Sequence, residues 1–264
     1  MSNQYEIHAI KYAQQMRKSS ANFLGGDPHE IDMPLNYFVW VVRNSERTIM
    51  VDTGFDSATA ARRGRVIERP VEEGLVALGV NPHAVQDVII THMHYDHAGN
   101  HGLFPAARFH LQEREMAFAT GPCMCHKSMR MALEADDVVA MVRRVFQDKV
   151  SFCSGPSQEI APGIEVHHVG GHTAGLQVVR VATQAGWVVL ASDASHFYAN
   201  MEQDRSHPII YDHFNVLQGF KKLRELAASP KHIVPGHDPL VLQRYPASLP
   251  GSGGWIVRLD HQAQ

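Results

Sequence analysis

Apolar runs separated by short polar turns dominate the first part of the chain. The runs Asn36–Val42 and Thr48–Asp52 flank the polar segment Arg43–Arg47, and this arrangement predicts a β-hairpin. A third run, Asp87–Ile90, is rich in β-branched residues and predicts a buried strand. A fourth strand is predicted at Arg108–Leu111. The first part of the chain is therefore expected to be rich in β-structure.

Apolar residues at helical intervals interrupt and follow these strands. Val71–Gly79 has such a pattern, and the longer region Glu113–Gln147 contains an apolar stripe at Val138, Met141, Val142 and Val145. The second half of the chain predicts further strands at Ile164–His168, Gln177–Val181, Trp187–Ser192 and His232–Val234, and a helix at Val216–Ala228. Two β-rich halves with helices outside predict a layered α/β sandwich, and we expect residues 1–264 to form a single domain.

Composition limits the binding partners and the cellular location that we expect for the protein. The 264 residues carry a formal net charge of −3, which gives no reason to expect nucleic acid or an anionic membrane as a partner. No apolar run reaches the roughly 18 residues of a membrane-spanning helix, and the first residues lack a signal-peptide pattern, so we expect a cytoplasmic protein. The cysteines Cys123, Cys125 and Cys153 are too few for a disulfide framework and are expected to be free thiols.

The segment directly after the predicted strand Asp87–Ile90 carries candidate metal ligands. His92, His94, Asp96 and His97 follow one another in the order His-x-His-x-Asp-His. Imidazoles and a carboxylate suit Zn²⁺ and its first-row neighbours. Ligands on a loop that leaves a strand would also lie at the sheet edge where α/β active sites collect.

Three later positions follow strands in the same way. His172 lies in Gly-Gly-His-Thr-Ala-Gly, Asp193 in Ser-Asp-Ala-Ser and His237 in Pro-Gly-His-Asp. Singly, they would be a turn histidine, a helix N-cap and a surface loop residue. Together with the first segment, they make a set of metal ligands.

In this set the sequence resembles the metallo-β-lactamase-fold hydrolases, from Asn36 to Asp238. The resemblance implies a single-domain αββα sandwich with two divalent metal ions between the sheets. We expect Zn²⁺, while manganese, cobalt or iron would also suit the ligands. By position, the ligands of one metal would be His92, His94 and His172, those of the other Asp96, His97 and His237, and Asp193 would bridge the two.

Departures from other branches of the superfamily narrow the chemistry. His94 stands where the diiron flavoprotein branch typically carries a glutamate, and Asp193 stands where several true β-lactamases carry a cysteine. The likeness to N-acyl-homoserine lactone lactonases is stronger, through His97-Ala98-Gly99-Asn100, Ser192-Asp193-Ala194-Ser195 and Pro235-Gly236-His237-Asp238. Those quorum-quenching enzymes commonly have a tyrosine three residues after the bridging aspartate. This chain has His196 there, with Tyr198 two residues later as an alternative substrate contact.

The resemblance implies that a hydroxide shared by the metals opens the ring of an N-acyl-homoserine lactone or a related lactone. We expect Asp96 to carry the proton to the leaving alkoxide and His196 to donate to the oxyanion, next to the bridging Asp193. The alternatives are another lactone or an ester, for example an aromatic-fused lactone, or an iron redox enzyme of the same fold. A metal-free binding protein is a third reading. At the level of the family, a homodimer is expected.

The substrate pocket and the supporting residues are predicted more broadly. The helical insertion 113–150 is expected to cover the active site, and the apolar candidates for the pocket are Met16, Phe23, Leu24, Met116, Phe118, the segment Met124–Met131 and Phe197. Asp52 is a candidate to orient a metal-binding histidine, and His168 a weaker one. The histidines interpreted as ordinary are His110, His126, His167, His168, His207 and His213.

Overall fold

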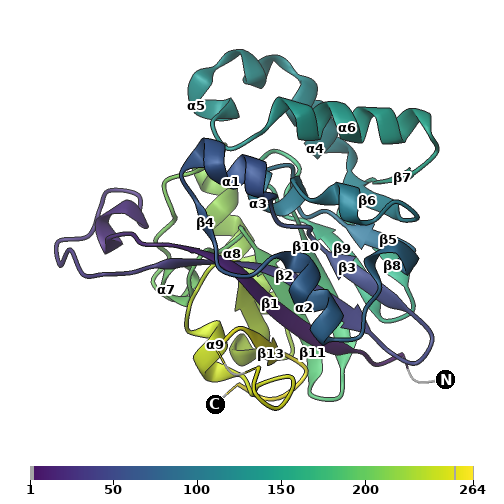
Figure 1. Cartoon of the computed structure of the whole chain (residues 1–264). Helices are drawn as coiled ribbons and strands as arrows, with labels where there is room; N and C mark the ends of the chain where they lie inside the picture. The colour runs from purple at the N-terminus through teal and green to yellow at the C-terminus, as the bar shows by residue number, and fades with distance from the viewer. Residues whose placement is uncertain (1–2, 253, 264) are drawn as a thin grey trace.

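Two β-sheets packed face to face make the centre of the molecule (Figure 1). The computed structural model describes residues 3–252 and 254–263. The first sheet has eight strands, in the spatial order β13 (Ile256–Arg258), β1 (Glu6–Gln15), β2 (Leu35–Arg43), β3 (Thr48–Val51), β5 (Asp87–Ile89), β6 (Arg108–Gln112) and β7 (Val150–Cys153), with β4 (Val66–Ile67) beside β1. Pairing is antiparallel from β13 to β3 and parallel from β3 to β7.

The second sheet has five strands and is mostly antiparallel. Their spatial order is β12 (Ile233–Pro235), β11 (Gly186–Ser192), β10 (Gln177–Thr183), β9 (Ile164–His168) and β8 (Ser157–Ala161). Only β11 and β12 run parallel, so their carboxyl ends lie at the same edge of the sheet.

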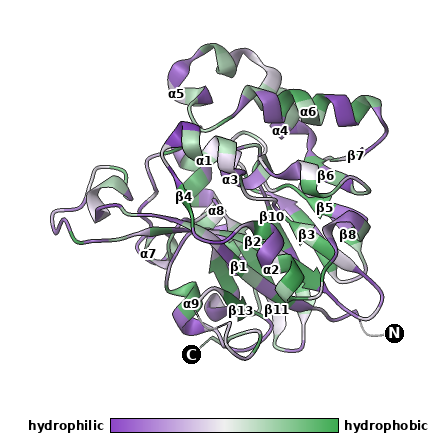
Figure 2. Cartoon of the chain, viewed as in Figure 1, coloured by the Kyte–Doolittle hydropathy of each residue, from purple (hydrophilic) through white to green (hydrophobic). Residues whose placement is uncertain are grey.

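The β2 strand explains why the sequence has an unbroken apolar run there. Successive side chains of a strand point to opposite faces, and both faces of β2 are buried. Trp40 packs into the core between the two sheets, together with Leu190 of the second sheet. Val39 points the other way and packs with Leu75 of helix α2 in a second core. Figure 2 shows the corresponding concentration of hydrophobic colour in the central strands.

Helices cover the outer faces of both sheets. Their bounds are α1 (Ser57–Arg63), α2 (Val71–Ala77), α3 (Tyr95–Ala98), α4 (Glu113–Thr120), α5 (Lys127–Arg130), α6 (Ala135–Phe146), α7 (Tyr198–Glu202), α8 (His213–Leu226) and α9 (Val241–Arg244), with short 3₁₀ turns at Ser19–Ala21, Pro82–Ala84, His101–Leu103, Pro122–Cys125 and Pro230–His232. Helix α2 packs on β1 and α8 packs on β11. This arrangement confirms the single-domain αββα sandwich. Within the described residues, no helix has the length and apolar character needed to cross a membrane.

The structure differs from the sequence prediction in two regions. The predicted helical region Glu113–Gln147 is broken into α4, a 3₁₀ turn, α5 and α6, and only Val138 and Met141 of the α6 stripe are buried. The long strand β1 was not predicted, because polar residues such as His8 and Lys11 interrupt its apolar pattern. Strand β1 lies between β2 and the last strand, β13, so pairing with distant segments of the chain defines it.

Candidate metal centre

Each of the seven candidate ligands follows a strand and is buried. His92 and His94 come after β5, on the loop that leads into α3, and Asp96 and His97 lie in α3 itself. His172 follows β9, Asp193 follows β11 and His237 follows β12. The backbone N–H of Gln177, at the start of β10, donates to the carbonyl of Thr91 at 3.0 Å, which joins the two sheets beside these loops. All seven predicted ligands therefore converge at one end of the sandwich.

Three histidines form the first group around one carboxylate oxygen. The Nε2 atom of His172 lies 3.2 Å from Nε2 of His92 and 2.9 Å from Nδ1 of His94. Oδ2 of Asp193 lies 3.2 Å from Nε2 of His172 and 3.9 Å from Nε2 of His92. Nitrogen atoms that face one another at these distances share a point where a cation fits between their lone pairs.

Asp96, His97 and His237 form the second group, around the other oxygen of the same carboxylate. Oδ1 of Asp193 lies 3.2 Å from Nε2 of His97 and 2.9 Å from Nε2 of His237. Oδ2 of Asp96 lies 3.6 and 3.7 Å from the same two nitrogens. The two oxygens of Asp193 thus face two separate groups of ligands, as a bridge between two metals requires.

The outer nitrogens of these histidines are held by the protein, which leaves the inner nitrogens free. Nδ1 of His97 lies 2.7 Å from Oδ2 of Asp52, and Nδ1 of His172 lies 2.7 Å from the carbonyl of Ile209. Nδ1 of His237 lies 2.7 Å from the carbonyl of Asn36. Metal-binding histidines characteristically donate their second N–H in this way. The residues present therefore fit two divalent cations, and Asp52 lies where the sequence analysis expected it to act.

Charge is distributed unevenly between the two groups. Burial, with the neighbouring histidines, holds the pKa of His92 and His94 well below the usual value, so both imidazoles are neutral. Burial also lowers the pKa of His97, but the carboxylates of Asp193 and Asp96 outweigh it and raise the pKa well above its usual value. The second group therefore attracts positive charge strongly, whether a proton or a metal ion supplies it.

Glu115 fastens the two ligand loops together and was not predicted. It lies on α4, is fully buried, and accepts hydrogen bonds from the backbone N–H of Met93 at 2.8 Å and of Gly175 at 3.0 Å. The hydroxyl of Thr173 donates to the same carboxylate at 2.6 Å. Gly175 allows this approach, because a Cβ atom there would lie 2.0 Å from the backbone nitrogen of Glu115. Nothing in the sequence marks Glu115, because its partners lie far away in the chain.

His196 lies beside the candidate bridge, with a second histidine against it. Its Nε2–H donates to Oδ2 of Asp193 at 2.9 Å, and burial lowers the pKa of His196 to about 3. His207 stacks on its ring, with centroids 3.7 Å apart and planes 7° from parallel. Nε2 of His207 donates to the carbonyl of Asp193 at 3.1 Å. His207 therefore lies against the candidate site, a position that the sequence did not predict.

The other histidines interpreted as ordinary lie away from the ligands. His110 pairs with Asp87, His167 with Glu165, and Nε2 of His168 donates to the carbonyl of Ala174. Tyr198, the alternative to His196, is buried in the core under the guanidinium of Arg244. It does not line the cavity beside the ligands.

A cavity of about 180 Å³ opens onto the two ligand groups. Its lining consists of Gln15, Arg17, Leu35, Tyr37, Arg63, Arg65, His94, Tyr95, Asp96, Met131, Ala132, His172, Asp193, His196, Ile209 and His237. Of the predicted apolar pocket residues, only Met131 is among them. The predicted insertion 113–150 contributes only Met131 and Ala132 to this lining. Most of the lining residues are polar or charged, and the tyrosines and arginines among them were missed because no local motif marks them.

Sequence comparison links the chain to a large superfamily of metal-dependent proteins. The metallo-beta-lactamase superfamily matches residues 33–237. An N-acyl homoserine lactonase from a Bacillus species is 25% identical over 230 residues, which cover 79% of this chain and 82% of the relative. An N-acyl homoserine lactonase from Agrobacterium fabrum is 26% identical over 234 residues, which cover 79% and 80%.

Solved structures show the same fold. A quorum-quenching N-acyl homoserine lactone lactonase superposes with a TM-score of 0.71 at 24% identity, over 90% of this chain and 93% of that chain. A dizinc quorum-quenching lactonase in complex with an N-hexanoyl-homoserine product has a TM-score of 0.68 at 16% identity, over 88% and 86%.

Proposed function

We propose that this chain, which belongs to the metallo-beta-lactamase superfamily, is a metal-dependent hydrolase that opens the ring of a lactone. The observation that carries the proposal is the position of Asp193, whose two oxygens face two separate groups of buried ligands. Its relatives at 25% and 26% identity are lactonases, and they supply the substrate class.

Two divalent cations held by these residues would supply an activated water near neutral pH and would polarise the ester carbonyl. The donor set suits Zn²⁺, as well as manganese, cobalt or iron. His92, His94 and His172 would hold one cation, and Asp96, His97 and His237 the other, with Asp193 shared between them.

The chain itself would handle the protons. Asp96 lines the cavity, and in our proposal its carboxylate accepts the proton of the attacking water and passes it to the alkoxide that leaves when the ring opens. His196 is neutral, because burial lowers its pKa to about 3, and a neutral imidazole has a single N–H. That N–H now faces Asp193. If metals engaged the carboxylate of Asp193, this N–H of His196 would be able to donate instead to the substrate carbonyl oxygen as negative charge develops there.

The test is hydrolysis of a panel of lactones by protein loaded with zinc or manganese. Ring opening releases one proton at neutral pH, and an indicator dye follows it. The panel contains acyl-homoserine lactones of short and long chain, simple γ-lactones, an aromatic-fused lactone and a linear ester, with chelator-treated protein as the control. We expect turnover of at least one lactone that depends on metal. Two bound metals with no hydrolysis of any lactone would contradict the proposal, and hydrolysis of the linear ester alone would make the protein an esterase.

A further inference from the structure

Three arginines surround the mouth of the metal cavity. Arg17 follows β1, Arg63 ends α1, and Arg65 lies between α1 and β4, so separate parts of the chain place them there. Nε of Arg65 donates to the hydroxyl of Tyr95 at 3.2 Å, and the guanidinium of Arg63 lies 4.1 Å from the centre of the same ring. Tyr95 therefore contacts both Arg63 and Arg65 and holds the two guanidinium groups close together.

Two of these arginines have no carboxylate partner among the described residues. Arg17 donates to the carbonyl of Ala21, and Arg65 donates to the carbonyl of Arg63 and to Tyr95. Arg63 differs, because its Nε lies 2.6 Å from a carboxylate oxygen of Glu134. Arg17 and Arg65 are both half-buried. Burial lowers the pKa of Arg17, and the nearby charge of Arg65 adds to this effect.

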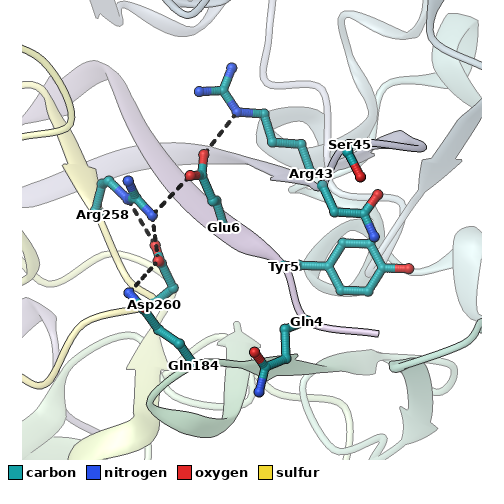
Figure 3. Close-up of a pocket in the computed structure, with 9 residues that line it drawn as sticks. Gln4, Tyr5, Glu6, Arg43, Ser45, Gln184, Arg258 and Asp260 are labelled. Atoms are coloured by element: carbon teal, nitrogen blue, oxygen red, sulfur yellow. Dashed lines mark hydrogen bonds and ion pairs between the residues drawn. The ribbon is translucent and has the colours of Figure 1, made fainter. Parts of the chain in front are cut away.

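A hollow at the opposite end of the sandwich shows how this chain treats arginines elsewhere (Figure 3). There Arg43 lies 3.3 Å from Glu6, and Arg258 lies 3.2 Å from Glu6 and also bonds to Asp260. Figure 3 shows the two guanidinium groups on either side of the Glu6 carboxylate. In that hollow the protein supplies its own counter-charge. At the metal cavity, Arg17 and Arg65 have no such carboxylate among the described residues, so an anion from outside the chain can take that place.

We propose that the cavity selects a compact lactone carrying an anionic oxygen group, such as a carboxylate, which Arg17 and Arg65 bind. Guanidinium groups recognise such anions through paired, charge-assisted hydrogen bonds. The volume agrees, since about 180 Å³ is below the roughly 300–1,000 Å³ of pockets for drug-sized ligands. A long acyl group would find few apolar contacts in this cavity, namely Leu35, Met131, Ala132, Ile209 and the rings of Tyr37 and Tyr95. This inference rests on the proposed lactone hydrolysis, whose carbonyl would lie at the metals while the anion lies at the mouth.

The experiment compares matched substrates on the metal-loaded protein. One is a γ-butyrolactone bearing a ring carboxylate, the second is its uncharged primary carboxamide, and the third carries a phosphate on a hydroxymethyl group. We expect kcat/KM to be about 10- to 100-fold higher for the carboxylate than for the carboxamide, as one or two charge-assisted hydrogen bonds would give. The preference should shrink as salt rises. Faster turnover of the phosphate would assign the anion as a phosphate ester.

Variants of Arg17 and Arg65 test whether these residues cause the preference for the charged substrate. Arg17→Met and Arg65→Met should each lower kcat/KM for the charged substrate about tenfold and leave the carboxamide within about twofold. Arg47→Met is the charge-matched control, because Arg47 lies in the β2–β3 turn with Glu46 as its only ion-pair partner among the described residues. Calorimetry with the ring-opened dicarboxylate product gives a second measurement, in which both cavity variants should weaken binding about tenfold.

The outcomes separate the two proposals. Equal kcat/KM for the carboxylate and the carboxamide, or equal losses on both in the arginine variants, would overturn the inference and leave lactone hydrolysis standing. Hydrolysis of no lactone at all would remove the proposed function, whereas product binding that depends on Arg17 and Arg65 would still support an anion site.

Discussion

The two ends of the sandwich solve the problem of buried charge in different ways. At the end shown in Figure 3, Glu6 and Asp260 pair with arginines that lie on neighbouring strands. At the other end, histidine nitrogens face one another at 2.9 and 3.2 Å, and the carboxylate of Asp193 is surrounded by imidazoles. The charges at the first end are paired within the chain, whereas in our proposal cations would complete the second.

This difference separates a structural site from a functional one. Paired charges at one end stabilise the fold without leaving a coordinating atom free. Unpaired lone pairs at the other end cost folding free energy until a metal binds them, because buried polar groups without partners are unfavourable. Substitutions at the two ends should therefore affect different measurements.

Removing the shared carboxylate should have the largest effect. We expect Asp193→Asn to lower turnover at least about a thousandfold, since the several kcal/mol contributed by two clamped metals would be lost. Metal analysis should find fewer than two ions per chain. Asp260→Asn at the opposite end is the control, with lower thermal stability but unchanged metal content. Full turnover with two metals bound in Asp193→Asn would show that this carboxylate is not needed to hold the metals or for the reaction.

Replacing His196, which lies beside that carboxylate, should lower turnover without changing the metal content. We expect His196→Ala to lower turnover about a hundredfold, as loss of one oxyanion donor does elsewhere, with two metals still bound. His167→Ala removes a histidine of β9 that pairs with Glu165 and should leave turnover within about twofold. Unchanged turnover in the His196 variant would remove this residue from the mechanism.

Loosening the link between the ligand loops should have a smaller effect. In Glu115→Gln, an amide N–H₂ would face backbone donors, so we expect a loss of about 1–3 kcal/mol in the free energy of unfolding. Metal affinity should fall about tenfold in chelator competition. Glu113→Gln changes the same charge on the exposed side of α4, where Ser154 is the one hydrogen-bond donor to Glu113 among the described residues, and should change neither quantity. Unaltered metal affinity in Glu115→Gln would show that the loops hold their positions without this carboxylate.

The smallest effect should come from the paired end and should depend on pH. Burial, with the charges of Arg43 and Arg258, lowers the pKa of His8 from 6.5 to about 4. The unfolded chain therefore binds more protons between these values, and stability is lost as pH falls from about 6.5 to 4. We expect His8→Gln to reduce the loss between pH 7 and pH 5.5 by about 1 kcal/mol, measured by urea unfolding of both proteins. An identical loss in both proteins would show that the pKa of His8 is the same in the folded and the unfolded state.

The candidate ligands could be predicted from the sequence because they lie shortly after strands. Asp193 directly follows β11 and His92 lies two residues after the apolar run that ends at Ile90, and strand ends of an α/β protein meet at one edge. The carboxylate of Glu115 and the ring of His207 could not be read, because only folding brings them to their partners. The polar cavity was missed for the same reason, since Arg17 and Tyr95 meet across 78 residues of chain that no local pattern connects.

The pairing of β1 with β13 has a consequence for how the chain is synthesised. The backbone of His8–Ile10 pairs with Ile256–Arg258, which a ribosome delivers about 250 residues later. Until then the first strand carries an uncovered edge in the nascent chain, and such edges recruit other strands. A translation stop shortly before β13 would release a chain with every metal ligand in place and an open sheet edge, prone to aggregate.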